Sequence, residues 1–343
     1  MKSDNDIQMK KVVVLGFDGA LASAITGVVD LFAMAGVSWN RIQQQEIHRL
    51  FQVEIASAQG QAIRCINGIL IQAHSAYADI KDVDIAIVPT IAGPIIETLQ
   101  QNPELIRYLK EADRQQKVIA GNCTGNFFLA EAGILNDRQA TTHWGFQDMF
   151  QTLYPKVKLH ADQLISRDQH IYCAGGGLAW FDLGLHLIER YYGFELAMQS
   201  AKSFVIDYRR DSQLSYSLLK IGKPHHDELV QKVQDWLEQH FHEALNLEQL
   251  ATRFNLTTRT LIRRFKQALD VPPNQYLQAL RIEAARKRLE ETEQAVDLIM
   301  QHVGYHDPSS FRRLFHKKTG LTPLEYRRRF SRRFYHVIKL QQL

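Results

Sequence analysis

The residues best suited to chemistry in the first two thirds of the chain are Cys123 and His143. They lie twenty positions apart, in the segments GNCTGNFFLAEAG and ATTHW. Cys123 follows an apolar run typical of a strand and precedes a helix that we expect to begin near Asn126. A cysteine at such a turn lies beside the amides of a helix N-terminus, which favour its thiolate form. A cysteine and a histidine support nucleophilic catalysis when a supporting acid is placed beside them.

The segments around these two residues, together with AGGGLAWFDLGLHLIE at residues 174–189, resemble the ThiJ/PfpI superfamily. The resemblance covers about residues 10–205. It implies an α/β domain with a flavodoxin-like fold, in which a doubly wound parallel sheet places the cysteine at a strand-to-helix elbow.

Three positions depart from the enzymes of that superfamily. Related proteins have an Asp near the first helix where this chain has Ala24, and a Pro where it has Val28; Asp18 and Asp30 match neither position. The Gly-Gly pair after the central strand is also altered, since the chain reads VPTIAG there. Catalysis would need an acid to donate a proton and backbone amides to stabilise an oxyanion. Because these positions are altered, we expect that the protein is not an enzyme and that Cys123 and His143 are vestigial.

The same region is interpreted as the binding site of a small-molecule effector, because pockets in doubly wound sheets form at the carboxyl ends of the strands. The residues expected near that edge are Ile91, Cys123, Thr124, His143 and Trp144. Trp144 either offers an aromatic face to a cationic effector or packs in the core. Trp180 lies on a strongly apolar segment and is interpreted as a core residue. Cys65 and Cys173 are interpreted as small buried hydrophobes.

The final third of the chain contains the same helix-turn-helix pattern twice, at residues 247–276 and 298–326. Upstream of the turn the two copies match at an offset of 49, and downstream at an offset of 50, as Phe265 and Phe315 show. A duplication in register on both sides of a one-residue insertion indicates a true repeat. A helix-turn-helix places its second helix in the major groove of DNA.

Each second helix is expected to begin at a capping side chain, Thr257 in the first copy and Asp307 in the second. The predicted DNA-binding residues share the outer faces of these two helices: Thr258, Arg259, Arg263 and Lys266, and Ser309, Arg312, Arg313 and Lys317. Arg259 and Arg263 are the best candidates for base reading, because arginine bonds guanine through two hydrogen bonds. Residues 275–291 predict a long helix that bridges the two copies.

The segments RIEAARKRLEET and VGYHDPSSFRRLFHKKTGLTPLEYRRRF resemble the AraC/XylS family of transcriptional regulators over about residues 226–330. One departure is Met300, where the family usually has a small Ala. The combination with a ThiJ/PfpI-like body is similar to regulators that respond to amines and amino-acid derivatives. It implies a sequence-specific regulator that binds double-stranded promoter DNA and a small metabolite, forms a homodimer through residues 1–222, and meets RNA polymerase. The competing interpretation is a cysteine-dependent hydrolase or hydratase with a DNA-binding tail.

The elements that must position these residues alternate in the body of the chain. Apolar, Val- and Ile-rich runs predict strands at residues 10–17, 51–58, 82–89, 116–122 and 170–176. Amphipathic stretches between them, and the segments 179–193 and 197–210, predict helices. Such alternation is typical of a parallel sheet covered on both faces. We therefore expect a sensing domain at 10–210, a linker at 211–224 and an all-α domain with two helix-turn-helix units at 225–330.

Composition limits the remaining possibilities. Residues 1–222 carry 20 Lys and Arg against 23 Asp and Glu, whereas residues 223–343 carry 21 against 14, so the positive charge lies in the predicted DNA-binding part. The terminal RRRFSRRFYHVIK either contacts phosphate or is a frayed basic tail. Three cysteines offer no disulfide framework, and no apolar run or leader predicts a membrane span or secretion, which favours the cytoplasm. The histidines have no metal-ligand spacing, and nothing predicts a cofactor.

Overall fold

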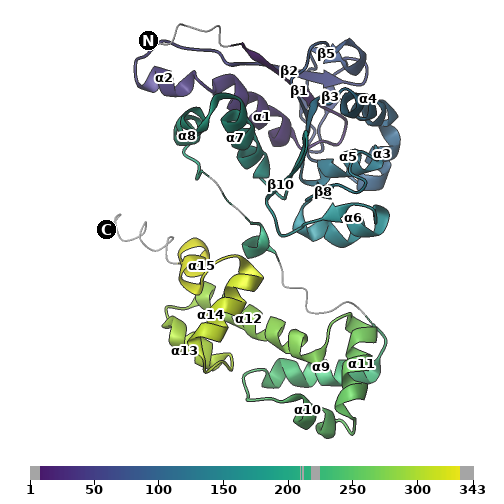
Figure 1. The fold of residues 1–343 in the computed structure, drawn as a ribbon, viewed down its shortest axis with the longest axis vertical. Coiled ribbons are helices and arrows are strands. Elements are labelled where there is room, and N and C mark those ends of the chain that lie inside the picture. The colour runs from purple at the N-terminus through teal and green to yellow at the C-terminus, as the bar shows by residue number, and fades with distance from the viewer. Residues whose placement is uncertain (1–7, 209, 211, 218–224, 333–343) are drawn as a thin grey trace. The chain divides into compact units, whose positions relative to one another are not determined.

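A computed structural model describes residues 8–208, 210, 212–217 and 225–332 of the chain. The chain divides into two compact units, Met1–Gln213 and Leu214–Leu343 (Figure 1). This division falls within the range 211–224 that the sequence predicts as a linker. Residues 211 and 218–224 of that range, and residues 333–339 of the basic tail, lie outside the described residues.

The first unit is built around a mostly parallel sheet. Among the described residues, seven strands pair in the order β10-β11-β7-β6-β1-β2-β5, and only β10 runs antiparallel to its neighbour. Their bounds are Ile165–Asp168 (β10), Ile171–Ala174 (β11), Val118–Asn122 (β7), Ile85–Val88 (β6), Lys10–Leu15 (β1), Phe51–Ser57 (β2) and Ser75–Ala76 (β5). Two small pairs lie apart from the sheet: β3 (Ile63–Arg64) with β4 (Leu70–Ile71), and β8 (Gln139–Ala140) with β9 (Lys158–Leu159).

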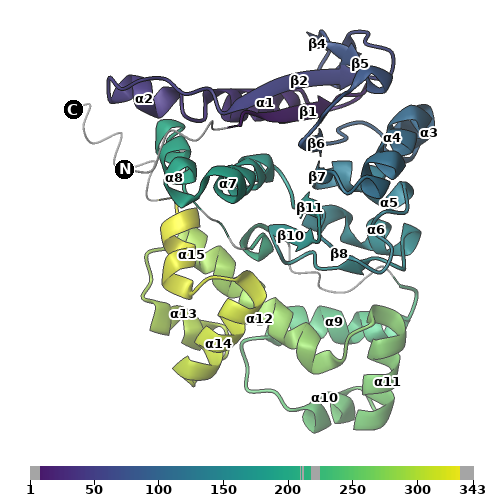
Figure 2. The same cartoon turned by 45° about the horizontal axis from the view of Figure 1, so that its top comes forward.

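Helices cover both faces of this sheet. Figures 1 and 2 show α1 (Ala22–Met34), α7 (Ala179–Tyr192) and α8 (Phe194–Ser203) on one face, and α3 (Ile95–Gln101), α4 (Pro103–Arg114) and α5 (Asn126–Glu131) on the other. The shorter α2 (Ser38–Ile42) and α6 (Gln147–Leu153) complete the unit. The predicted doubly wound α/β fold is confirmed. Its central strands β6, β7 and β11 are buried along their whole length, which explains their largely apolar sequences.

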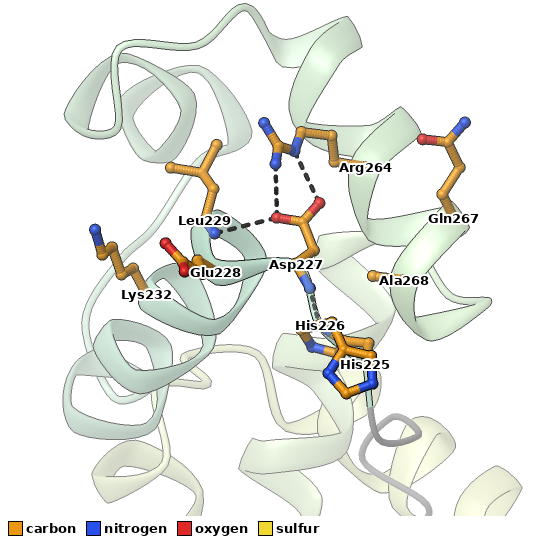
Figure 3. A pocket seen from close by; sticks show the side chains of 9 residues that line it. All are labelled: His225, His226, Asp227, Glu228, Leu229, Lys232, Arg264, Gln267 and Ala268. Carbon is orange, nitrogen blue, oxygen red and sulfur yellow. Dashed lines mark hydrogen bonds and ion pairs between the residues drawn. The ribbon is translucent and has the colours of Figure 1, made fainter.

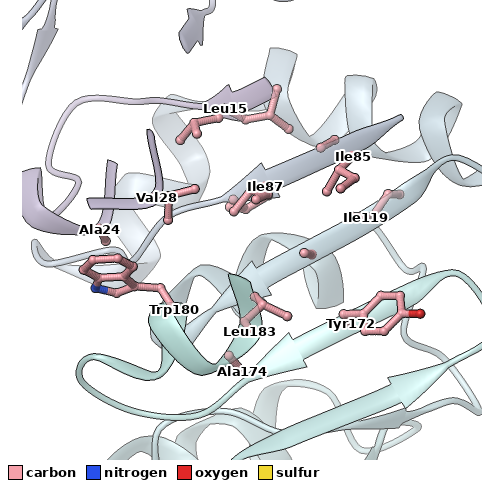
Figure 4. Close-up of a cluster of buried hydrophobic side chains, with 14 of the residues drawn as sticks. Leu15, Ala24, Val28, Ile85, Ile87, Ile119, Tyr172, Ala174, Trp180 and Leu183 are labelled. Atoms are coloured by element: carbon pink, nitrogen blue, oxygen red, sulfur yellow. The ribbon is translucent and has the colours of Figure 1, made fainter. Parts of the chain in front are cut away.

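The core beneath α1 and α7 depends on small residues at the contact between the two helices. A Cβ on Gly27 would come within 2.0 Å of the Trp180 ring, so the indole packs directly on the backbone of α1. Trp180 is 3% exposed, which confirms its prediction as a core residue, and Figure 4 shows it beside Ala24 and Val28. Cys65 and Cys173 are buried and free, as expected for small hydrophobes.

One helix of the first unit differs from its predicted bounds. The sequence predicts a helix over residues 197–210, but α8 runs from Phe194 to Ser203. Gly193, with a φ of 88°, ends α7 and lets the chain turn directly into α8. At the other end, Val205 has a φ of 55°, which no helix accommodates.

The second unit is helical. Its helices are α9 (Glu228–His240), α10 (Leu247–Arg253), α11 (Thr258–Leu269), α12 (Pro273–Glu291), α13 (Val296–His302), α14 (Pro308–Thr319) and α15 (Pro323–Phe330). In the described residues it has two separate hydrophobic cores, one for each helix-turn-helix. Helix α12 contributes Tyr276 to the first core and Ile282 and Leu289 to the second, so the predicted bridge is confirmed. Met300 is 3% exposed and fits the second core.

Candidate functional site

The elbow between β7 and α5 carries Cys123 in a left-handed conformation, with a φ of 57°. A short 3₁₀ turn, Cys123–Gly125, leads from this residue into α5. Gly125 lets the turn lie against the loop after β6, because a Cβ there would approach the Pro89 carbonyl oxygen to 2.3 Å. A strained backbone enclosed in this way holds the thiol in one place.

The ionisation of Cys123 differs from the sequence-based expectation. Burial raises the pKa of this thiol above its ordinary value. Hydrogen bonds from the backbone of Thr124 and Gly177 and from the hydroxyls of Thr124 and Thr90 lower the pKa but do not outweigh burial. The helix amides that favour a thiolate are present, but the side chain is only 5% exposed. Cys123 is therefore a protonated thiol at neutral pH.

Ile91 and Thr124 lie at the same edge and are joined directly. The Thr124 hydroxyl donates a hydrogen bond of 2.5 Å to the carbonyl oxygen of Ile91. Both side chains are buried, at 3% and 2% exposure. Neither side chain is open to solvent in this structure.

His143 and Trp144 form the accessible part of the site. Both side chains are half-buried, and their ring centroids lie 5.2 Å apart. His143 Nδ1 accepts a hydrogen bond of 2.9 Å from the Gly145 amide, which leaves Nε2 as the protonated nitrogen of a neutral ring. Burial lowers the pKa of His143, so the ring is neutral at pH 7.

The glycine turn after β11 connects these two parts. A Cβ on Gly176 would approach the His143 ring to 2.2 Å, so the backbone lies against that ring. The next amide, Gly177, donates to the Cys123 thiol. The residues that the sequence predicts for effector binding thus gather around one turn at the carboxyl edge of the sheet, with Ile91, Cys123 and Thr124 inside and His143 and Trp144 outside.

The carboxylate that related proteins carry near the first helix has no counterpart at the corresponding position, Ala24. Ala24 and Val28 are buried against Trp180, so the place of the missing carboxylate is hydrophobic core (Figure 4). The Asp18 carboxylate is exposed and accepts a hydrogen bond of 2.8 Å from the Arg64 amide.

Two backbone amides of the altered VPTIAG loop are bonded to a neighbouring carbonyl oxygen. The amides of Ala92 and Gly93 both donate to the carbonyl oxygen of Gly19, at 3.0 and 3.2 Å.

Gln213 belongs to this site, although the sequence gives no sign of it. Its side-chain amide is buried, at 2% exposure, and donates a hydrogen bond of 2.7 Å to the Thr142 carbonyl oxygen. Its oxygen accepts hydrogen bonds from the amides of Trp144 and Gly176, at 3.3 and 3.0 Å. A glutamine in a polar segment carries no periodic signal, and its partners lie 37 to 71 residues earlier in the chain.

The first helix-turn-helix consists of α10 and α11. Asn255, with a φ of 54°, makes the turn, and the Thr257 hydroxyl accepts from the Thr260 amide, which confirms the predicted cap. Leu261 and Phe265 are buried in the core. Arg259, Arg263 and Lys266 are exposed and Thr258 is half-buried; with Ile262 and Gln267 they line one shallow depression on the outer face of α11.

The second helix-turn-helix, α13 and α14, repeats this arrangement. Asp307 caps α14 by accepting a hydrogen bond of 2.7 Å from the Ser310 amide, as predicted, and Phe311 and Phe315 lie in the core. The predicted DNA-contact residues are all exposed: Ser309, Arg312, Arg313 and Lys317. Arg312 also lies 3.5 Å from the carboxylate of Asp297, an ion pair that the sequence did not predict.

A second hollow lies where α9 begins, between the start of that helix and residues 264–268 of α11 (Figure 3). Asp227 caps α9 by accepting hydrogen bonds from the Leu229 and Val230 amides, at 3.1 and 3.0 Å. Arg264 donates two hydrogen bonds to the same carboxylate, at 2.7 and 2.9 Å. This pair ties α9 to the recognition helix α11. In the described part of the chain no group of His, Cys, Asp or Glu could hold a metal ion, and no helix is long and apolar enough to cross a membrane.

Comparison with known proteins gives a family match for each of the two units. Residues 10–190 match the DJ-1/PfpI family, and residues 250–329 match a helix-turn-helix domain. The HTH-type transcriptional regulator CdhR of Pseudomonas aeruginosa is 32% identical over 282 residues, which make up 81% of this chain and 82% of that protein. The HTH-type transcriptional regulator GbdR of the same species is 26% identical over 289 residues, with 84% and 77% covered.

Among solved structures, DJ-1beta of Drosophila melanogaster is similar in fold to the first unit. It is 18% identical, has a TM-score of 0.50, and is covered completely by 59% of this chain. The match to the DJ-1/PfpI family spans more than half of the chain, and the similarity to CdhR extends through both units. The chain therefore belongs to the DJ-1/PfpI family and is a transcriptional regulator that joins a DJ-1/PfpI domain to an AraC-type helix-turn-helix domain.

Proposed function

We propose that the first unit of this regulator binds a small amine or amino-acid derivative at the site formed by Cys123, His143 and Trp144, without chemical turnover. The second unit then reads promoter DNA through the outer faces of α11 and α14. The residues proposed for this contact are Thr258, Arg259, Arg263, Lys266, Ser309, Arg312, Arg313 and Lys317. In this proposal the chain acts as a homodimer and meets RNA polymerase at the promoter.

One observation carries the proposal of a sensor in place of an enzyme. Ala24 stands where related proteins have an Asp and is fully buried beside Trp180, so this position supplies no acid to the Cys123 thiol. The raised pKa of the buried Cys123 thiol agrees with it. A buried thiol without a placed acid can line a pocket, but it cannot easily attack a substrate and protonate a leaving group.

The accessible side chains of the site favour a cationic effector. Trp144 is half-buried beside the His143 ring, and Phe146 is 39% exposed one short turn further on. Aromatic faces attract ammonium groups through their ring quadrupoles. Because the pKa of His143 is lowered, its ring carries no charge that would repel such a ligand at pH 7.

A thermal-shift screen of amines and amino-acid derivatives on the full chain tests this site. A ligand that binds the native state adds about 2.7 kcal/mol to the free energy of unfolding at one hundred times its Kd, and so raises the melting temperature. We expect Trp144→Ala to abolish the shift of any hit. Trp39→Ala, which removes a half-buried tryptophan of α2, should keep it. Equal loss in both variants, or retention in Trp144→Ala, would refute the assigned site.

The second candidate function is a cysteine-dependent hydrolase or hydratase. The observation in its favour is the left-handed elbow at Cys123, a strained conformation of the kind that often marks functional residues. Its test is incubation of the purified chain with amides, isonitriles and 2-oxoaldehydes, in parallel with Cys123→Ser. We expect no turnover in either protein; turnover that Cys123→Ser abolishes would establish the enzyme.

The ionisation of Cys123 gives an independent test between a sensor and a cysteine-dependent enzyme. Because burial raises the pKa of this thiol, we expect its alkylation by iodoacetamide to be slow at pH 7 and to accelerate continuously up to pH 9. Mass spectrometry of the Cys123 peptide measures this rate. A rate that is already constant between pH 6 and pH 8 would indicate a thiolate and would favour the enzyme.

A further inference from the structure

Gln213 is the last residue of the first unit, and its side chain holds the loops of the effector site together. Its Oε1 accepts from the amides of Trp144 and Gly176, the two segments that enclose the His143 ring. Its Nε2 donates to the carbonyl oxygens of Thr142 and Ala161, at 2.7 and 2.9 Å. One buried amide thus links three separate loops of the sensor.

The surrounding backbone is shaped to admit this side chain. A Cβ on Gly175 would lie 2.8 Å from the Gln213 amide, so only glycine leaves the space that the amide fills. The Gln213 backbone amide donates to the Asp162 carbonyl oxygen at 3.1 Å, and the neighbouring Ser212 pairs with Gln163 in an isolated bridge. The end of the first unit is therefore anchored by both backbone and side chain.

Residues 215 and 217, at the start of the second unit, are anchored within that unit. Arg286 of α12 is 5% exposed and donates hydrogen bonds to the carbonyl oxygens of Ser217 and Ser215, at 2.8 and 3.3 Å. Its Nε donates to the Tyr326 hydroxyl at 2.8 Å. A guanidinium buried in this way and bonded to backbone carbonyls ties the start of the second unit to the helix that bridges both helix-turn-helix motifs.

Only Leu214 separates the anchor of one unit from that of the other along the chain. We propose that Gln213 is a positioning residue that couples the effector site to the DNA-binding helices. A ligand on the His143 and Trp144 rings moves the same backbone amides that Gln213 holds, and any shift of Gln213 passes through Leu214 to the segment held by Arg286. This inference rests on the proposed function, because it takes the site around His143 as the effector site.

Reciprocity allows a test that needs no effector. If the sensor loops influence DNA binding, DNA binding must influence the sensor loops by the same factor, and such coupling commonly amounts to about 5- to 150-fold. The probe is a DNA duplex selected by the full chain from a random-sequence pool. The readout is hydrogen exchange at the amides of Gly145 and Gly177, whose hydrogen bonds go to His143 and Cys123 and not to Gln213.

In the wild-type chain we expect saturation with the selected duplex to change exchange at these two amides by at least about fivefold. A duplex of scrambled sequence should not produce this change. Gln213→Ala should abolish the response. Gly175→Ala should abolish it too, because the added methyl displaces the Gln213 amide while the residue itself remains. Gln151→Ala, which changes an exposed glutamine of α6, is the matched control and should respond like the wild type.

The proposal fails if the wild type shows no response, if Gln213→Ala keeps it, or if Gln151→Ala loses it. Two different variants address the same hydrogen bonds, so instability of one does not decide the result. No metabolite enters this experiment. A failure to find an effector and a failure of coupling are therefore separate outcomes.

Discussion

Arginine and lysine share the exposed face of α11 but have different capacities for reading DNA. A guanidinium can form two parallel hydrogen bonds with one guanine, whereas an ammonium acts as a point charge toward phosphate. Arg263 lies in the first two turns of the helix and Lys266 one turn later. Because both side chains are exposed and belong to the same surface, they form a matched pair for separating base reading from charge.

We predict that Arg263→Ala costs about 1–3 kcal/mol at the selected site and relaxes specificity at one base pair. Arg313→Ala should do the same for the second motif. Lys266→Ala should weaken binding to all DNA sequences alike. It should also reduce the slope of log affinity against log salt concentration by about the amount of one phosphate contact. Fluorescence anisotropy on the selected duplex and its single-base variants measures these effects. An equal loss for every sequence in Arg263→Ala would remove its proposed role in base reading.

At the scale of an element, the start of α9 depends on a carboxylate that serves two purposes. Asp227 caps the helix and also accepts two hydrogen bonds from Arg264 of α11 (Figure 3). The Arg264 guanidinium lowers the pKa of Asp227, with help from the capping amides. A group whose folded-state pKa is lowered contributes stability above its unfolded pKa and loses that contribution as the pH falls through the folded value.

We therefore predict that Asp227→Ala destabilises the second unit by about 1 kcal/mol at pH 7, as expected for the loss of an N-cap. The difference from the wild type should begin to shrink near pH 4, the pKa of an unfolded Asp, and vanish as the pH falls through the lower folded-state pKa of Asp227. Urea unfolding followed by circular dichroism at several pH values measures this. Glu228→Ala, at the exposed next position, is the control and should change stability by less than about 0.5 kcal/mol. A pH-independent difference would contradict the role of the carboxylate charge.

At the scale of the whole molecule, one chain offers two recognition helices joined by a single bridging helix, α12. Regulators commonly double such a reading surface by pairing, because a two-fold dimer matches repeated half-sites on the DNA.

We predict a homodimer that forms through residues 1–222. Sedimentation velocity of the full chain at micromolar concentration should give the mass of two chains. A fragment of residues 1–222 should also sediment as a dimer. If residues 1–222 sediment as a monomer at that concentration while the full chain is dimeric, pairing resides in the DNA-binding part. A monomeric full chain would contradict the prediction altogether.

Local patterns in the sequence determined most of the architecture. The runs that became β6, β7 and β11 are recognisable because a strand buried on both faces is mostly apolar, and β1 and β2 are recognisable from their Val- and Ile-rich segments. The caps Thr257 and Asp307 and the outer faces of α11 and α14 follow from spacing along a helix, which neighbouring residues establish by themselves. The repeat at offsets of 49 and 50 identified both helix-turn-helix units.

Only the tertiary structure decided the properties that depend on distant neighbours. The spacing of Cys123 from α5 suggested a thiolate, but the degree of burial, which many remote residues create, reversed the sign of its pKa shift. The end of α8 was misplaced because apolar periodicity continues beyond the left-handed Val205, where the backbone leaves the helix. Gln213 was missed because its hydrogen-bond partners lie in loops between residues 142 and 176. A sequence pattern shows the spacing of residues along the chain, but not which distant residues become neighbours in the fold.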